Sequence, residues 1–325
     1  MWILIISSFL IAFIASAIIL PYIKNWIENK KKLKEDLNKF KKPRLKSLEG
    51  IFCVIIFITT ISLILSLQKI LNINNFDFHK IIAGLLSVIT IALINFIDDI
   101  LKIPNKIIKY FLMLPAIIPA IIIDFNHRTI DIPSYDPYNI SLLYPLLIIP
   151  FTILITVAAT NASKKLNAPV FNNYIIISSA LIICAWLKES YTAIIIFSCL
   201  LGMFLSLKNY HEIEPKNISL GKIGRSSFGT ILAIGAIIGN IKLSLLILIT
   251  PYLIYLFIWK IYKLILKIKN INTDKIGAIK IFNFKITTKQ LLKFIFILET
   301  ISALIAITLQ INRVNPNFIF QLISY

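Results

Sequence analysis

Long apolar runs separated by short polar segments fill most of this chain. The runs carry few charges, and most are long enough to cross the hydrocarbon core of a bilayer as a helix. They predict an all-α polytopic membrane protein with about ten transmembrane helices, of which the sixth and eighth are short for a bilayer. The predicted helices are Trp2 to Tyr22, Ile51 to Leu67, Ile81 to Ile97, Ile107 to Ile123, Ile140 to Ala159, Tyr174 to Leu187, Tyr191 to Leu207, Phe228 to Ile241, Leu243 to Leu266 and Leu291 to Ile311.

Composition agrees with this pattern. Hydrophobic residues make up 58% of the 325 residues, which is more than a typical soluble domain contains. The three cysteines lie in apolar runs without metal-ligand spacing, so we interpret them as packing residues. We therefore expect residues 1–325 to form one integral membrane domain in the cell membrane.

The distribution of charge predicts the orientation of the helices. If both termini lie outside the cytoplasm, the cytoplasmic segments hold 28 of the 34 lysines and arginines. Every loop then satisfies the rule that basic residues gather on the cytoplasmic side. A face of this charge attracts anionic lipids, nucleotides and lipid phosphates. Nucleic-acid binding is disfavoured, because no module of aromatic and basic residues accompanies the lysines.

Two adjacent aspartates, Asp98 and Asp99, follow the third apolar run in the segment ALINFIDDILKIPNK. A helix carries the negative pole of its dipole at its C-terminal end, so two carboxylates there repel the helix end and each other. A cation or a proton must compensate them. The sequence therefore predicts that this pair binds a cation or that one of the two acts as a base.

The fourth cytoplasmic loop ends in the glycine-bearing segment LGKIGRSSFG. Its first two glycines with Lys222 and Arg225 can wrap a phosphate with backbone N–H groups and positive charge. A turn followed by a helix N-cap is the alternative interpretation of the same residues. The segment by itself does not decide between the two.

Four segments, in this order, resemble one family. KEDLNKFKKPRLKSLEGI, NFIDDILKIPNKIIKYFLMLPA, AATNASKKLN and EPKNISLGKIGRSSFG are similar to the motifs of the polyprenyl-phosphate (dolichyl- or undecaprenyl-phosphate) N-acetylhexosamine-1-phosphate transferases, glycosyl transferase family 4. These membrane enzymes move a sugar 1-phosphate from a UDP-sugar to a lipid phosphate and release UMP. The resemblance implies cytoplasmic active-site loops, a polyprenyl or dolichyl phosphate and a UDP-sugar as partners, and magnesium as cofactor. It leaves a homodimer open.

The resemblance also implies roles for individual residues. Asp98 and Asp99 match the catalytic aspartate pair, and Asn161 matches a metal ligand. The implied substrate-binding residues are Lys42, Lys106, Asn161, Asn167, Lys222 and Arg225.

The chain departs from the family pattern at positions that matter for the metal. Lys222 stands where the resemblance places a metal-binding aspartate, and an ammonium cannot ligate Mg²⁺. The segment from Lys267 to Lys289 contains no histidine, whereas many family members carry a histidine cluster there. Lys222, Arg225, Lys164 and Lys165 could supply part of the missing positive charge.

Three functions stay open at this point. The first is that the chain is still a transferase, which moves a sugar 1-phosphate, with N-acetylglucosamine 1-phosphate as the first candidate, from a UDP-sugar to a polyprenyl or dolichyl phosphate. The second is a catalytically impaired relative that binds a lipid phosphate or a nucleotide sugar, or that serves as a partner subunit. The third is a transporter, because Glu299 is an acid well inside the last apolar run, although we find no internal repeat.

Overall fold

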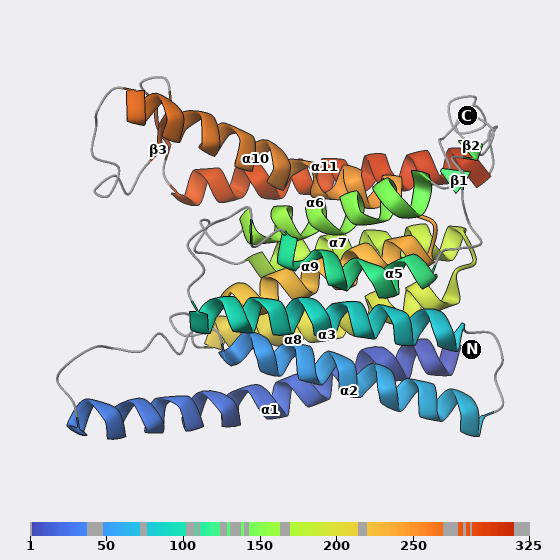
Figure 1. Ribbon diagram of the computed structural model, residues 1–325, viewed down its shortest axis with the longest axis horizontal. Coiled ribbons are helices and arrows are strands. Elements are labelled where there is room, and N and C mark those ends of the chain that lie inside the picture. The colour runs from blue at the N-terminus through green and yellow to red at the C-terminus, as the bar shows by residue number, and fades with distance from the viewer. Residues whose placement is uncertain are drawn as a thin grey trace.

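The computed structural model describes residues 2–37, 48–71, 77–101, 108, 111–123, 129–130, 138–139, 143–162, 170–213, 220–268, 279–281, 284–286 and 288–314. The helices in these ranges are α1 (Trp2–Leu37), α2 (Leu48–Ile70), α3 (Phe78–Leu101), η2 (Leu114–Ala116), α5 (Ile117–Ile123), η3 (Tyr144–Ile148), α6 (Ile149–Ala162), α7 (Val170–Leu187), α8 (Tyr191–Ile213), α9 (Gly221–Ile238), α10 (Lys242–Ile268) and α11 (Thr288–Val314). The long helices lie side by side as one layered bundle (Figure 1).

Six helices in the described part of the chain are long and apolar enough to cross a membrane. Two further apolar helices, Phe171–Leu187 and Lys242–Ile258, are shorter. Large apolar side chains stay exposed on the outer helices, as at Ile6, Leu63 and Leu304, and a lipid-facing surface accounts for this pattern. The prediction of a polytopic helical membrane protein is confirmed, while the number of ten spans stays a prediction.

Four short strands form two hairpins at opposite ends of the bundle (Figure 1). β1 (Thr129–Ile130) pairs antiparallel with β2 (Tyr138–Asn139), and β3 (Ile279–Ile281) pairs antiparallel with β4 (Phe284–Ile286). Each pair only closes a connection between helices, so the strands contribute no layer to the fold.

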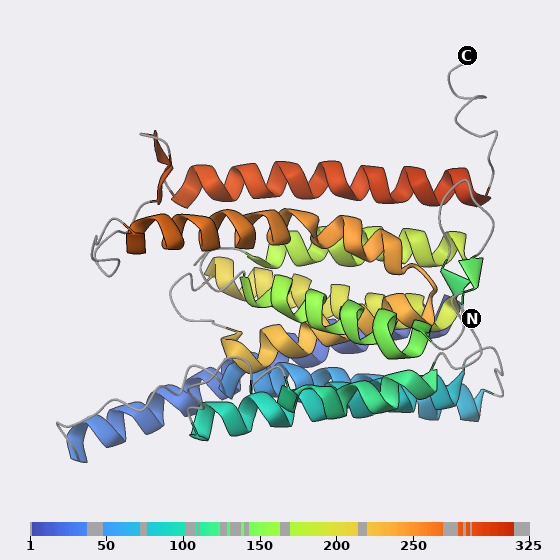
Figure 2. The same cartoon turned by 45° about the horizontal axis from the view of Figure 1, so that its top comes forward.

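The first residues of α1 and the last residues of α11 lie at the same end of the bundle (Figures 1 and 2). At the other end α3 and α6 finish, and α2, α7 and α9 begin. We call this second end the site end. It is the end at which the sequence places the aspartate pair and the glycine-bearing segment.

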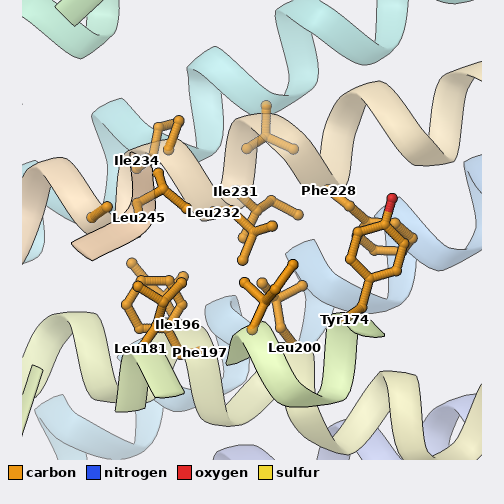
Figure 3. Close-up of a cluster of buried hydrophobic side chains, with 14 of the residues drawn as sticks. Tyr174, Leu181, Ile196, Phe197, Leu200, Phe228, Ile231, Leu232, Ile234 and Leu245 are labelled. Carbon is orange, nitrogen blue, oxygen red and sulfur yellow. The ribbon is translucent and has the colours of Figure 1, made fainter. Parts of the chain in front are cut away.

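Helix α9 lies at the centre of the bundle. Of its 18 residues, 15 are buried, and it packs against α2, α3, α6, α7, α8 and α10. Its small residues allow neighbouring backbones to come close, which is how helices associate where lipid gives no hydrophobic drive between them. Farther along the helix, Ile231 and Leu232 meet Leu200 of α8 in the apolar core (Figure 3).

The start of α9 differs from the expected loop. The helix begins at Gly221 and not near Phe228, so Lys222 and Arg225 belong to its first turns. Gly221 has φ 56°, which lets the chain turn sharply into the helix. The Gly224 N–H then donates to the Leu220 carbonyl over 3.1 Å. Tertiary packing of this buried turn outweighs the poor helix propensity of its glycines.

Candidate functional site

Five of the eight predicted site residues lie in the described part of the chain, and all five lie at the site end. Asp98 and Asp99 are in the last turn of α3, Asn161 is in the last turn of α6, and Lys222 and Arg225 open α9. The other three, Lys42, Lys106 and Asn167, lie outside the described residues, as do Lys164 and Lys165. The structure therefore joins three separate sequence motifs.

Two glycine contacts fix the position of the α9 N-terminus. A Cβ added at Gly50 of α2 would lie 2.2 Å from the Leu220 carbonyl oxygen and 2.6 Å from the Gly224 nitrogen. A Cβ at Gly229 would lie 2.5 Å from Oγ1 of Thr160 in α6. Only hydrogen in place of a side chain permits this approach, so α2 and α6 hold the first turns of α9 between them.

Lys222 and Asp98 form an ion pair between α9 and α3. The Lys222 ammonium donates to Oδ2 of Asp98. The Asp98 side chain is 5% exposed and the Lys222 side chain 28% exposed, so the pair lies at the edge of the buried core. The prediction that a cation compensates the aspartate pair is consistent with this pair, and the cation in the structure belongs to the protein.

The environment of Lys222 also affects its own protonation. Lys222 precedes the apolar part of α9, and burial lowers its pKa to about 8. The Asp98 carboxylate favours the charged form of this ammonium. Lys222 is therefore protonated at neutral pH and loses its proton within the pH range that an enzyme assay can reach.

Asp99 and Arg225 interact electrostatically with each other beside the ion pair. Asp99 is exposed, because neighbouring residues of a helix point about 100° apart and Asp98 takes the inward direction. Burial lowers the pKa of Arg225, while Tyr174 and the Asp99 carboxylate act on it in the opposite direction. The Arg225 Nε is buried and makes no hydrogen bond within the described residues. Arg225 therefore keeps donor capacity for an anion.

Asn161 is held by a residue that the sequence analysis did not single out. Its Nδ2 donates to Oγ of Ser226 over 3.0 Å, and Ser226 Oγ can donate to Asn161 Oδ1 over 3.3 Å. Ser226 lies one helical turn after Lys222 and thus on the same side of α9. Ser226 is part of the segment GRSSFG, so its place in this motif could have identified it as a site residue.

Tyr174 of α7 is a second residue that the sequence analysis missed. Its hydroxyl donates to the Thr160 carbonyl over 3.4 Å, and its ring stacks on Phe204 with centroids 4.9 Å apart. Figure 3 shows Tyr174 beside Phe228 of α9 with its hydroxyl directed away from the apolar cluster. No motif marks this tyrosine, because only the packing of α6, α7 and α9 brings it to the site.

The described residues do not fit a divalent metal at this site. Asp98 is occupied by an ammonium, and the Asn161 amide is occupied by Ser226. Within the described ranges, no group of three or more histidine, cysteine, aspartate or glutamate side chains could hold a metal ion. A divalent ion next to Lys222 would also be repelled by the ammonium. We therefore derive no step of the chemistry through magnesium.

Glu299 lies apart from this cluster, inside α11. It is fully buried, and neither carboxylate oxygen has a hydrogen-bond partner in the described structure. Tyr252 of α10 interacts with it electrostatically, and the Tyr252 hydroxyl is also buried. Glu299 does not reach the site residues through any hydrogen bond that we observe among the described residues.

Comparison with known proteins gives consistent matches. Residues 81–240 match the model of the family described as glycosyl transferase family 4. A protein of Saccharolobus solfataricus is 29% identical over 259 residues, which cover 77% of this chain and 76% of that protein. A protein of Sulfolobus acidocaldarius is 27% identical over 257 residues, with the same coverage. Both are provisionally named UDP-N-acetylglucosamine–dolichyl-phosphate N-acetylglucosaminephosphotransferase. The matched region contains Asp98, Asn161 and Lys222.

Proposed function

Because the chain belongs to glycosyl transferase family 4, we propose that it transfers a sugar 1-phosphate from a UDP-sugar to a polyprenyl or dolichyl phosphate and releases UMP. N-acetylglucosamine 1-phosphate is the group proposed first, since both relatives carry that sugar in their names. The observation that carries the proposal is the meeting of Asp98, Asn161, Lys222 and Arg225 from three helices at one end of a membrane bundle.

The arrangement suits phosphoryl transfer, which depends on positioning and on stabilising negative charge. An oxygen of the lipid phosphate attacks the β-phosphorus of the UDP-sugar and forms a new P–O bond. The bond from that phosphorus to the oxygen bridging the two phosphates breaks, and its electron pair leaves with UMP. Lys222 and Arg225 supply cationic donors for the diphosphate.

The two aspartates take different roles in this proposal. Asp98 is buried against Lys222 and holds the ammonium in place, so it acts as a positioning residue. Asp99 is exposed at the helix end and is available to orient the lipid phosphate or to accept its proton. The pair thus divides the work that the sequence assigned to both residues together.

The surface around Asp99 suits a substrate that arrives from the bilayer. The apolar side chains of Ile97, Ile100 and Leu101 are 46%, 62% and 66% exposed on the same turns of α3. A lipid chain can lie against such a surface while its phosphate reaches the helix end. By the distribution of basic residues, this end faces the cytoplasm of a multi-pass protein in the cell membrane. A homodimer is compatible with this arrangement.

Release of UMP by the purified protein tests the proposal. The full chain in detergent or nanodiscs is incubated with dolichyl or undecaprenyl phosphate and with several UDP-sugars in turn. We expect UMP to appear together with a lipid-linked sugar diphosphate, and UMP release to require the added lipid phosphate. Absence of UMP with every pair would contradict transfer and favour the alternative, a family member that binds lipid phosphate or nucleotide sugar without turnover.

A further inference from the structure

Both members of the Asp98–Lys222 pair occupy an unfavourable helix end. Asp98 places a negative charge in the last turn of α3, where the helix dipole is itself negative. Lys222 is the second residue of α9 and places a positive charge at the positive pole of that helix. Neither charge gains from its own helix. Each charge is stabilised by the other, because the packing of α9 against α3 places the Lys222 ammonium next to the Asp98 carboxylate.

Lys222 gives its position the same net charge as an aspartate with one bound divalent ion. The resemblance places an aspartate at this position, and replacing an aspartate by a lysine changes the local charge by +2. A site with Lys222 and no metal therefore carries the same net charge as a site with aspartate and one Mg²⁺. The electrostatic requirement of a bound diphosphate can be met either way, although a lysine does not bridge two phosphates as a metal does.

Lys222 and Arg225 both have N–H groups that could bind an anion, and the Lys222 side chain is partly exposed. The Lys222 side chain is 28% exposed, and an ammonium has three N–H donors, of which Asp98 Oδ2 accepts one. Arg225 lies three residues after Lys222 and is therefore its neighbour on the surface of α9. The Arg225 Nε is buried and makes no hydrogen bond in the described structure. These two side chains can contact one diphosphate together.

We propose that Lys222 is the built-in cation of this site, so that the diphosphate of a nucleotide sugar binds through Lys222 and Arg225 without a divalent metal ion. The inference rests on the proposed function for the identity of the ligand. It differs from the expectation of magnesium that the family resemblance implies, and it assigns Lys222 to ligand binding as well as to the ion pair with Asp98.

Binding measurements with and without a chelator test this inference. UDP-N-acetylglucosamine is titrated into the full chain by calorimetry, once with EDTA and once with Mg²⁺. We expect the wild-type dissociation constant to change by less than about threefold between the two conditions. Lys222→Asp should weaken binding in EDTA by about tenfold or more, since it replaces a cationic donor by an acid. Mg²⁺ should restore part of that loss in Lys222→Asp only.

Paramagnetic Mn²⁺ provides a readout that does not depend on activity. Wild type should show no stoichiometric Mn²⁺ binding by electron paramagnetic resonance, whereas Lys222→Asp should gain it. Lys69→Asp is the matched control, because Lys69 is an exposed lysine near the other end of α2. Stoichiometric Mn²⁺ binding by wild type, or loss of wild-type nucleotide-sugar binding in EDTA by more than about tenfold, would overturn the inference.

The two proposals fail in different ways. If wild type binds the nucleotide sugar in EDTA but never releases UMP, the built-in cation stands and transfer fails. If wild type releases UMP only with Mg²⁺, transfer stands and the built-in cation fails. If no nucleotide sugar binds under either condition and no UMP forms, both proposals fail.

Discussion

Two buried carboxyl groups, Asp98 and Glu299, show how differently this bundle treats the same chemical group. Asp98 lies at the site end with a lysine donating to it. Glu299 lies 11 residues into α11, roughly 17 Å from its start, with no hydrogen bond to either oxygen in the described structure. A buried carboxylate is costly unless it is paired. The difference is that Lys222 compensates the charge of Asp98, whereas no residue in the described part of the chain donates a hydrogen bond to Glu299.

Removal of the Lys222 ammonium should have the largest effect. Lys222→Met leaves the buried Asp98 without its cation and takes a donor from the diphosphate, so we expect transfer to fall about 100-fold or more. UMP release measures the effect, and Lys69→Met is the control. Activity within about threefold of wild type would show that Lys222 contributes no essential charge.

The Asp98–Lys222 pair should also contribute to the thermal stability of the protein. Asp98→Asn and Lys222→Met should each lower thermal stability, since each leaves one buried charge unpaired. The double variant should be more stable than the sum of the two losses predicts, with a coupling of about 1–3 kcal/mol. Thermal unfolding in nanodiscs provides the measurement. Additive losses would mean that the two side chains do not interact.

Closing the glycine crossing of α2 and α9 should have the next largest effect. The added methyl group of Gly50→Ala meets the Leu220 carbonyl, pushes the α9 N-terminus away and moves Lys222 from Asp98. We expect about tenfold slower transfer and a stability loss of about 1–3 kcal/mol. Gly202→Ala is the matched control, because its Cβ would lie 2.4 Å from the Phe9 carbonyl of α1, away from the site.

Gly202→Ala should lower the free energy of unfolding by a similar amount, whereas the folded protein should transfer sugar 1-phosphate at the wild-type rate. If both variants slow transfer equally, the effect of Gly50 would be one of general packing and not of Lys222 position.

The pH dependence of nucleotide-sugar binding should reflect Lys222. Its pKa of about 8 means that the ammonium is charged below that pH and neutral above it. Binding of the anionic diphosphate should therefore weaken as the pH rises through 8. Asp98, Asp99 and Arg225 are the other charged groups of this cluster. Lys222→Arg should remove the transition, because a guanidinium stays protonated. A transition that persists in this variant would assign it to another group.

Replacement of Glu299 should have the smallest effect on transfer. Glu299→Met substitutes an apolar side chain of similar length at a fully buried position, where the carboxylate oxygens accept no hydrogen bond from the residues that the structure describes. We expect transfer within about twofold of wild type and a melting temperature equal to or above it. A tenfold or larger loss of transfer would contradict the distinction between Asp98 and Glu299 and would show that Glu299 takes part in the mechanism.

Much of the bundle could be predicted from the apolar runs alone. The helices α2, α3, α8 and α11 appear where such runs were expected, since a segment in lipid has to satisfy its backbone hydrogen bonds internally. The start of α9 could not be predicted in this way. Its first turns are rich in glycine and charge, and their helical form depends on the packing of Gly50 and Gly224 between two helices.

The residues of the candidate site could also be predicted only in part. Motif order and the family resemblance predicted Asp98, Asn161, Lys222 and Arg225 as members of one site, and the structure places them at the same end of the bundle. The pairing of Lys222 with Asp98 and of Asn161 with Ser226 could not be predicted. These partners are 124 and 65 residues apart in the chain, and no local rule sets such contacts.

The sequence by itself thus determined the class of the protein, the position of α2, α3, α8 and α11 and the chemical groups near the helix ends, because hydrophobicity and charge act locally along the chain. Only the tertiary structure decided which aspartate is buried against a lysine and which is exposed. That choice depends on how α3 packs against α9, while close packing at Gly50, Gly224 and Gly229 fixes α9 against α2 and α6.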